Sequence, residues 1–349
     1  MAISPSRWRE MAIWSETSAR RAVNWLEGTL LQAGPRSETA VCAAGGHGYA
    51  GILASATLGS RYGASYLLDG IVRQWMVSPG EFHALDEPGE LRRRSFLRNS
   101  SLLLAACVLG RADVLTEPAI ARLQAYQHSS GGFFDMDPGQ GHGLVEVFTT
   151  AWGGRVALRF GWHERARRAA RLVADILHLQ PDPGERFYFC YDTISRAVST
   201  RWRPSEPIAR FVDFARPAGE THQLGMALAF LAEMHLADPA SGWNRPTREV
   251  LRLLGLWASA MLQQPAMAVV AEGLALAAWA LGPEAEAARL LLPTALEGVR
   301  EAVEPCGALP AWHSGAGPSY ERAFTALEST GWGSVCLAGL AQACSILGS

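Results

Sequence analysis

The chain lacks a strong excess of charge of either sign. Its 349 residues include 31 basic and 33 acidic side chains, which give a net charge of −2, and only 18% of all residues are charged. A basic surface of the kind that binds nucleic acid or an anionic membrane is therefore not expected. Two basic runs, Arg92–Arg94 and the arginines between positions 165 and 171, are explained as solvated helix faces.

Paired cysteines and targeting segments are also missing. No CxxC pair occurs, so we expect the cysteines to be reduced, buried thiols rather than metal ligands or disulfides. The N-terminal residues have no apolar core of a secretory signal, and we expect no membrane-spanning helix. These observations predict a cytoplasmic protein. The six scattered cysteines are Cys42, Cys107, Cys190, Cys306, Cys336 and Cys344.

The short motifs of common catalytic and cofactor sites do not occur. There is no GxGxxG after a strand, no P-loop, no HExxH and no GxSxG. The segment Gly45–Gly48 is rich in glycine, but it precedes an apolar run instead of following a strand. We therefore predict no nucleotide cofactor and no metal.

Glycines recur at one period along the chain. Gly59, Gly110 and Gly161 lie 51 residues apart, each at the end of an apolar, alanine-rich run, and the same ending returns at Gly282 and Gly348. Glycine directly after an apolar helix is a common helix stop, because it enters the left-handed conformation without a steric clash. A stop that recurs at a fixed period predicts a repeated helical hairpin.

Each repeat contains two different helices. The first is apolar on nearly all sides and must be buried, whereas the second has an apolar stripe opposite charged residues. The expected buried helices span 51–58, 102–109, 150–160, 223–236, 268–281 and 333–347. The expected amphipathic helices span 65–75, 117–126, 164–177, 246–261 and 283–302.

This count leaves the last buried helix without an amphipathic partner. A helix beginning at Ser4-Pro5 and running to about Gln32 can take that place and close a ring. A closed ring needs no polar terminal cap, unlike an open solenoid. We therefore predict an all-α fold, an (α/α)6 toroid of six inner and six outer helices in one domain over 1–349. An irregular insertion covers about 180–221, with a short hairpin expected at Phe187–Tyr191.

One segment resembles a known superfamily. The residues Gln127, Gly131 and Phe133 resemble the Q-x3-G-x-aromatic element of squalene/hopene-type cyclases. The following run, Phe134–Gly139 and Val147–Gly153, is similar to a conserved stretch of protein prenyltransferase β subunits. About 35 residues carry this likeness, which implies the terpenoid cyclase/prenyltransferase toroid superfamily and an apolar substrate.

The chain departs from both families at the residues that carry their chemistry. Phe148 stands where prenyltransferases have a zinc-binding histidine, and no D-x-C pair follows, so the resemblance implies no zinc here. Asp135-Met-Asp137 is followed by Pro138, so the D-x-D-D proton donor of class II cyclases is incomplete. Six-hairpin sugar enzymes and the linalool dehydratase-isomerase type share the helical outline but supply no matching motif.

Polar and aromatic residues gather in segments that lead into the inner helices, and the topology places these segments at one mouth of the ring. Each residue also has a structural interpretation, such as a helix cap, a turn or a satisfied buried hydrogen bond. A carboxyl buried there, as at Glu272, would have a raised pKa and serve as an acid. The predicted catalytic residues are Asp135, Asp137, His142, His222 and Glu272. The predicted substrate-binding residues are His47, Tyr49, Asn99, Glu146, Trp152, Tyr191, Asp192, His313, Glu328 and Trp332.

Three functions are compatible with this pattern. The main hypothesis is a cofactor-independent cyclase, isomerase or lyase that acts on an apolar terpenoid or polyketide intermediate in natural product biosynthesis. The second is a six-hairpin sugar-active enzyme, either an epimerase or an unsaturated-uronide hydrolase, with histidine and carboxylate pairs in a polar cavity. The third is a non-catalytic ligand-binding toroid. The expected partner is a small molecule, and homo-oligomerisation stays open.

Overall fold

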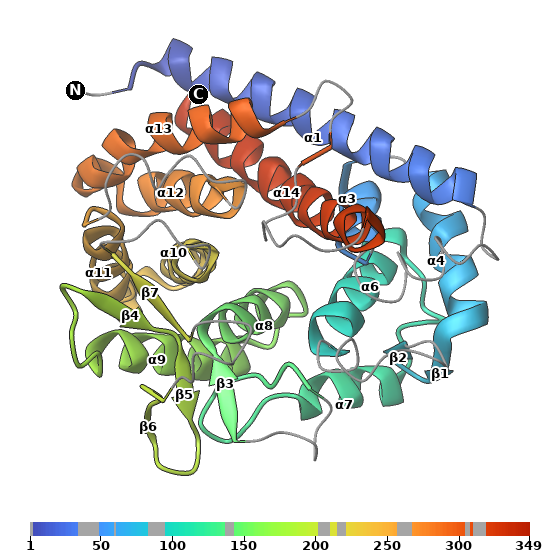
Figure 1. Cartoon of the computed structure of the whole chain (residues 1–349), viewed down its shortest axis with the longest axis horizontal. Helices are drawn as coiled ribbons and strands as arrows, with labels where there is room; N and C mark the ends of the chain where they lie inside the picture. Colours follow the sequence, from blue (N-terminus) through green and yellow to red (C-terminus); the bar gives the residue numbers. More distant parts are fainter. Residues whose placement is uncertain are drawn as a thin grey trace.

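A computed structural model describes most of the chain. The described residues are 3–33, 49–58, 61–82, 95–136, 143–201, 210–214, 221–256, 267–303, 308–309 and 319–349, with only the backbone described at 30–33 and 319–328. These residues contain twelve α-helices and little β-structure. They form the predicted (α/α)6 toroid, which Figure 1 shows along its short axis.

Six apolar helices form the inner ring, as the sequence predicts. Neighbours in the ring pack in the order α3, α6, α8, α10, α12 and α14, and α14 returns to α3. They are apolar because both the ring interior and the outer helices cover them. Their bounds are Tyr49–Leu58 (α3), Ser95–Leu109 (α6), Val147–Arg159 (α8), His222–Ala237 (α10), Met267–Leu281 (α12) and Ser319–Leu347 (α14).

Six amphipathic helices form the outer layer. The N-terminal helix α1 packs along α14 and completes the ring, which confirms the predicted closure (Figure 1). In α9 the buried stripe includes Ala166, Val173 and Ile176, and arginines occupy the other face. The outer helices are Pro5–Ala33 (α1), Arg61–Trp75 (α4), Glu117–Ala125 (α7), His163–His178 (α9), Asn244–Leu254 (α11) and Glu286–Ala302 (α13).

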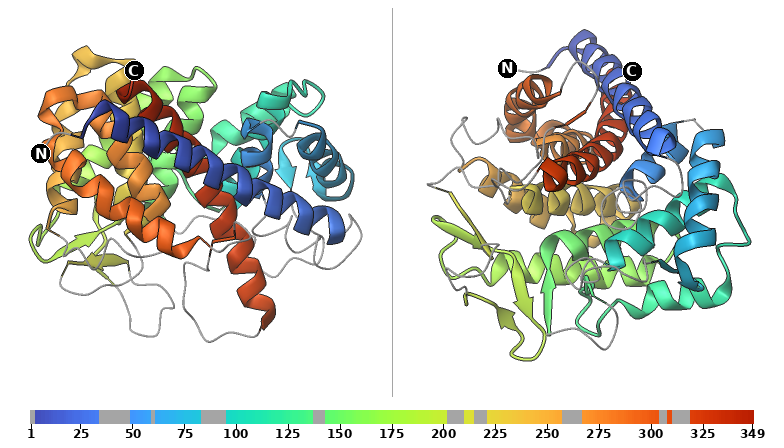
Figure 2. Two further views of the ribbon diagram at one scale, coloured as in Figure 1. Left: turned by 90° about the horizontal axis from the view of Figure 1, so that it is seen from above. Right: turned by 45° about the vertical axis from the view of Figure 1, so that its right-hand side comes forward.

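At 29 residues, α14 is longer than the other inner helices, which have 10 to 16 residues. Figure 2 shows its N-terminal part extending beyond the ring, on the side where the strands lie. β3 enters α8 directly, so this side is the one from which the chain enters that inner helix. The strands therefore lie at the predicted mouth.

Short strands replace the expected hairpin in the insertion. Phe187–Tyr191 is extended, but β4 pairs with β7 and β5 pairs with β3 and β6, so β4 and β5 do not pair with each other. The hairpin prediction was wrong because alternation of side chains predicts an extended backbone but does not identify the strand with which it pairs. The strands are Met76–Ser78 (β1), Glu81–Phe82 (β2), Leu144–Glu146 (β3), Arg186–Tyr188 (β4), Cys190–Asp192 (β5), Ala197–Val198 (β6) and Phe211–Asp213 (β7).

The repeated glycines end helices as predicted where the structure describes them. Gly110 and Gly161 have φ angles of 74° and 72°, and each follows the last turn of an inner helix. A Cβ atom is strained in this left-handed conformation, so glycine terminates α6 and α8 at low cost. Gly59, the first of the series, lies outside the described residues.

The cysteine prediction is confirmed in part. Cys190, Cys336 and Cys344 are buried and are not in disulfides, whereas Cys107 is exposed near the C-terminus of α6, so the expectation of burial was wrong there. Burial raises the pKa of Cys344 to about 12. Cys42 and Cys306 lie outside the described residues.

Two helical segments are apolar enough and long enough to cross a membrane by length and composition alone. The expectation of no membrane span stays a prediction. Met267–Glu284 and Ser329–Leu347 meet both criteria, but 72% and 56% of their residues are buried within the fold. Core helices of globular proteins have the same apolar composition, because other elements of the fold cover most of their surface. The cytoplasmic location stays a prediction.

Glycines allow two inner helices to approach at backbone distance. A Cβ on Gly225 of α10 would lie 2.8 Å from the Val270 nitrogen of α12, and one on Gly273 would lie 2.6 Å from the Gly225 oxygen. Neither contact can be relieved by moving a side chain, because both involve the backbone. The separation of α10 and α12 therefore depends on these glycines.

Replacing Gly225 with alanine is expected to lower the free energy of unfolding by about 1–3 kcal/mol, because the added methyl group forces the two helices apart. Urea unfolding of Gly225→Ala and the wild type measures this change. Gly184→Ala is the matched control, since a Cβ there meets nothing within 4 Å. Equal stability of Gly225→Ala and the wild type would contradict this packing.

Candidate functional site

The first turns of α8 and α10 are joined at the mouth of the ring. Gln223 Oε1 accepts a hydrogen bond from the backbone N–H of Phe148 at 2.8 Å. The first N–H groups of a helix have no partner within the helix, so a neighbouring side chain commonly satisfies them. This contact fixes the relative height of the two helices. It places Phe148 and His222, which lie in the same two turns, beside one another.

Several predicted site residues fall on the mouth segments that the structure does not describe. His47, Asp137, His142 and His313 lie outside the described residues, as does the side chain of Glu328. Their assignments stay predictions.

Four predicted residues come together with Phe148 in a cluster that we call the aromatic layer. The Trp332 ring centroid lies 4.8 Å from that of Trp152, 5.5 Å from Phe148 and 6.1 Å from Tyr49, each with nearly perpendicular planes. His222 packs edge-on against Phe148 at 5.2 Å. These side chains come from four inner helices, α3, α8, α10 and α14. The structure therefore brings Tyr49, Trp152, His222 and Trp332 together, and their roles in catalysis and substrate binding stay predictions.

The aromatic layer is a packed floor rather than an open surface. Trp332 is 1% exposed, and Trp152 Nε1 donates a hydrogen bond to Ser100 Oγ at 2.9 Å. Perpendicular ring contacts contribute about 0.5–1.5 kcal/mol each beyond the area they bury. The layer is consequently rigid, and His222, at 9% exposed, is its most accessible member.

Asn99 and Asp135 lie at the N-terminus of α6. Asn99 Oδ1 accepts from the backbone N–H of Phe82 at 3.1 Å, and its Nδ2 donates to the Tyr126 hydroxyl at 3.0 Å. The main-chain oxygen of Asp135 accepts from the N–H of Phe96 at 3.1 Å. Asn99 is thus held by internal hydrogen bonds, and Asp135 is anchored through its backbone, so its side chain can be replaced without breaking this contact.

The remaining described site residues are brought together by the three-stranded sheet. Strand β5 pairs with β3 so that Asp192 lies opposite Leu144, Tyr191 opposite Val145, and Cys190 opposite Glu146. Because β3 leads directly into α8, this pairing attaches the insertion to the mouth of the ring.

Asp192 closes a turn after β5. Its Oδ1 accepts from the N–H of Ile194 at 2.8 Å and of Ser195 at 3.3 Å. These hydrogen bonds, the first above all, hold the pKa of Asp192 below its ordinary value. Asp192 therefore suits a role as an ionised turn residue, and its contact with substrate stays a prediction.

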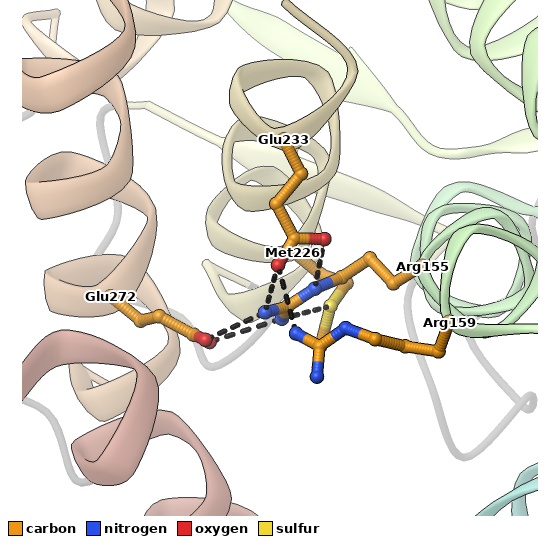
Figure 3. Close-up of polar contacts among 5 residues, drawn as sticks. All are labelled: Arg155, Arg159, Met226, Glu233 and Glu272. Atoms are coloured by element: carbon orange, nitrogen blue, oxygen red, sulfur yellow. Dashed lines mark hydrogen bonds and ion pairs between the residues drawn. The ribbon is translucent and has the colours of Figure 1, made fainter. Parts of the chain in front are cut away.

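Arg155, Glu233 and Glu272 form a buried cluster that we call the ion-pair layer, and Figure 3 shows the contacts among their side chains. The Arg155 guanidinium donates to Glu272 at 2.7 and 3.1 Å and to Glu233 at 2.9 and 3.0 Å. Its Nη1 also contacts Met226 Sδ at 3.6 Å. The exposed fractions of the three charged side chains are 5%, 13% and 1%. This network joins α8, α10 and α12.

The ion-pair layer lies below the aromatic layer. Arg155 follows Phe148 by seven residues on α8, or about 10 Å along the helix axis at the standard helical rise. Glu233 follows His222 by eleven residues on α10, in the same direction away from the mouth. The ring therefore has a packed aromatic layer toward the mouth with a charged layer beneath it.

Glu272 was predicted to be a catalytic acid, and the structure gives it a partner instead of an open position. A Cβ on Gly339 of α14 would lie within contact distance of Glu272 Oε1, so glycine makes room for this carboxylate. Burial, followed by the charge of Glu272, raises the pKa of the neighbouring Cys336 thiol. The geometry of Glu272 is that of a structural ion pair, and its catalytic role stays a prediction.

Sequence reasoning missed Arg155 and Glu233. Each is a charged residue within an otherwise apolar inner helix, as is Glu272. A charge on a buried helix requires an opposite charge nearby. One arginine and two glutamates in apolar helices therefore indicated a buried ion pair.

Replacing Arg155 is expected to destabilise the fold strongly. Arg155→Met leaves Glu233 and Glu272 buried without their cation, at a cost of about 3–5 kcal/mol in the free energy of unfolding. The matched control is Arg159→Met, because Arg159 contacts Glu233 at 3.3 Å but is 62% exposed, so its loss should cost less than about 1 kcal/mol. Chemical unfolding of both variants tests this, and equal losses would contradict a central role for Arg155.

Glu233 gives the stability a defined pH dependence. Burial opposes its ionisation, but the charges of Arg155 and Arg159 outweigh burial and lower its pKa below the ordinary 4.5. A lowered folded-state pKa stabilises the protein above pH 4.5 and loses that contribution as the pH falls through the folded value. Urea unfolding from about pH 7 to pH 3 should therefore show a smaller acid-induced loss for Glu233→Gln than for the wild type. Parallel curves would refute the linkage.

No group of three or more histidine, cysteine, aspartate or glutamate side chains within the described residues is arranged to hold a metal ion. Because three candidate histidines lie outside those residues, the absence of a metal stays a prediction.

Comparisons with known proteins show the fold. No protein-family model and no curated protein matches the chain. An unsaturated glucuronyl hydrolase specific for heparin matches with a TM-score of 0.58 at 14% identity, covering 94% of this chain and 97% of that one. A family 105 glycoside hydrolase from C. acetobutylicum ATCC 824 matches with a TM-score of 0.54 at 11% identity, covering 91% and 98%. A possible family 105 member from Salmonella enterica serovar Paratyphi A has the same TM-score and identity, covering 98% and 95%.

These similarities correct the main sequence hypothesis. The α/α-toroid part of the superfamily resemblance is confirmed, but the similar structures are sugar hydrolases, so the terpenoid cyclase assignment and its natural-product substrate are wrong. The error came from about 35 residues whose glycine and aromatic pattern reflects helix packing. Gln127, for example, donates to the backbone oxygens of Gly131 and Arg165 and so joins α7 to α9.

Proposed function

We propose that this chain is a sugar-active enzyme that hydrolyses oligosaccharides ending in an unsaturated uronic acid. The observation that carries the proposal is the match of the whole ring, over more than 90% of both chains, to an unsaturated glucuronyl hydrolase and to family 105 glycoside hydrolases. A match of this extent supports a similar mouth and a similar class of substrate.

The chemistry of such a substrate requires one acid and one water molecule. The ring of an unsaturated uronide contains an enol ether, in which a carbon–carbon double bond is conjugated to the carboxylate. Protonation of the double bond at C4 and addition of water at C5 give a hemiketal. Opening of this hemiketal breaks the bond between C5 and the ring oxygen and leaves a ketone at C5 and a hemiacetal at C1. Collapse of the hemiacetal to an aldehyde then releases the glycosidic oxygen as an alcohol. A carboxyl group or an imidazole whose pKa is close to the working pH can donate the proton and take it back.

Two described residues are suited to this proton transfer. Asp135 lies at the N-terminus of α6, at the mouth end, and His222 lies in the first turn of α10 at the edge of the aromatic layer. The aromatic layer supplies the rigid apolar floor that a ligand pocket needs, with polar groups placed around it. In this arrangement the sugar ring lies above the floor, and the acid and base act from the mouth side.

The decisive experiment follows the loss of ultraviolet absorbance of the conjugated double bond in unsaturated uronyl oligosaccharides. The wild type should consume this chromophore, and Asp135→Asn or His222→Ala should each lower kcat by about 100-fold or more, the usual contribution of a general acid or base. Asp113→Asn is the control, because Asp113 is 62% exposed and pairs with Arg111 on the outside of the ring.

Circular dichroism melting separates a lost function from a lost fold, since Asp135→Asn keeps the main-chain hydrogen bond to α6. Unchanged absorbance with the wild type on heparin-, chondroitin- and pectin-derived unsaturated oligosaccharides would overturn the proposal. Full activity in both variants would overturn the assignment of Asp135 and His222.

A further inference from the structure

The arginines of α9 differ in their partners. Arg167 lies 3.5 Å from Asp238 and 3.7 Å from Glu164, and Arg171 lies 3.8 Å from Glu164. Arg165 and Arg168 have no carboxylate within 4.0 Å among the described residues. A solvated helix face explains the first two arginines, but it does not explain two half-buried cations without a counter-charge.

The two unpaired arginines converge on one neutral oxygen. Gln127 Oε1 accepts from Arg165 Nη1 at 3.3 Å and from Arg168 Nη2 at 3.0 Å. The Gln127 amide is fixed in this orientation, because its Nε2 donates to the backbone oxygens of Gly131 at 3.0 Å and of Arg165 at 2.9 Å. The fixed amide therefore holds two guanidinium groups close to each other.

Arg165 has a structural role, whereas Arg168 does not have an equivalent one. Arg165 Nη1 donates to the backbone oxygen of Gln124 at 3.1 Å, at the C-terminal end of α7 where a cation is favourable. Arg168 donates to the shared Gln127 oxygen, and its Nε is buried with no hydrogen-bond partner. Burial, followed by the charge of Arg168, lowers the pKa of Arg165.

We propose that Arg165 and Arg168, held by Gln127, form an oxyanion-binding site on the outside of the ring, between α7 and α9. Planar guanidinium groups present paired N–H donors that match carboxylate, sulfate and phosphate oxygens. The anion approaches the Nη edges of both side chains and supplies the missing negative charge. The oxyanion is either a free inorganic ion or a substituent of an anionic saccharide, and the second source rests on the proposed function.

Sulfate binding tests the site without any catalytic assay. Isothermal titration of the wild type with sodium sulfate, against sodium chloride at equal ionic strength, should show saturable binding of sulfate only. Arg168→Gln should weaken this binding by about tenfold or more, as expected for loss of a charge-assisted hydrogen-bonding pair. Arg171→Gln is the matched control on the same helix, because its side chain is 61% exposed, and it should bind as the wild type does.

Arg168→Lys keeps the variant series informative if the glutamine variant folds poorly. It retains the charge but loses the planar fork, so it should bind sulfate more weakly than the wild type and more tightly than Arg168→Gln. Absence of sulfate-specific binding to the wild type, or equal affinity of the wild type and Arg168→Gln, would overturn the proposal.

Competition identifies the source of the oxyanion. A sulfated or uronate-containing oligosaccharide that displaces sulfate, when an uncharged oligosaccharide of the same length does not, supports the saccharide as ligand. Failure of both to compete overturns the saccharide source and assigns the site to free anions. Sulfate binding that persists in a protein without activity on unsaturated uronides would separate this site from the proposed function.

Discussion

The buried ion pairs of Arg155 join three helices of the inner ring. Arg155 is enclosed by apolar helices and is held by Glu233 and Glu272 from two other helices of the ring. A buried charge is tolerated only when its counter-charges are fixed in place, so α8, α10 and α12 cannot slide or rotate independently. In other proteins, apolar residues can replace such a network without loss of stability. We therefore infer that the network serves to align the three helices. The network sets the height at which the helices meet.

The layers above the ion pairs depend on this register. Arg155 and Glu233 join α8 to α10 in the ion-pair layer, and the hydrogen bond from Phe148 N–H to Gln223 joins their first turns. Phe148 and His222 are thereby brought together, and Trp332 completes the aromatic layer from α14. Glycines at 225 and 273 bring the backbones of α10 and α12 into contact, which leaves little freedom between them. A rigid floor with polar residues around its rim is an arrangement in which acid–base chemistry can be positioned, because the catalytic groups need little reorganisation. The ring thus separates a layer of buried ion pairs from the mouth, where we propose the reaction takes place.

The sequence predicted much of the fold but less of the site. Periodic glycine stops and two helix types predicted the toroid and its closure by α1, because burial on all sides or on one side leaves a clear pattern in the sequence. Tyr49, Trp152, His222 and Trp332 were also expected at one place, since topology alone brings the starts of inner helices together. Pairing could not be predicted in the same way. Alternation at Phe187–Tyr191 does not reveal that β4 pairs with β7 and β5 with β3. Arg155 and Glu233 are far apart in the sequence, so their contact leaves no local pattern. The cyclase resemblance failed because Gln127 and its neighbouring glycines record helix packing, which unrelated chemistries share.

The mass of the product tests the proposed hydrolysis most directly. An unsaturated uronyl disaccharide is incubated with the protein in water enriched in oxygen-18, and the products are identified by mass spectrometry. The account predicts two monosaccharide products, with one atom of the heavy oxygen retained in the product derived from the unsaturated residue. A product of unchanged mass would instead indicate an epimerase or isomerase, and an intact disaccharide would contradict the account.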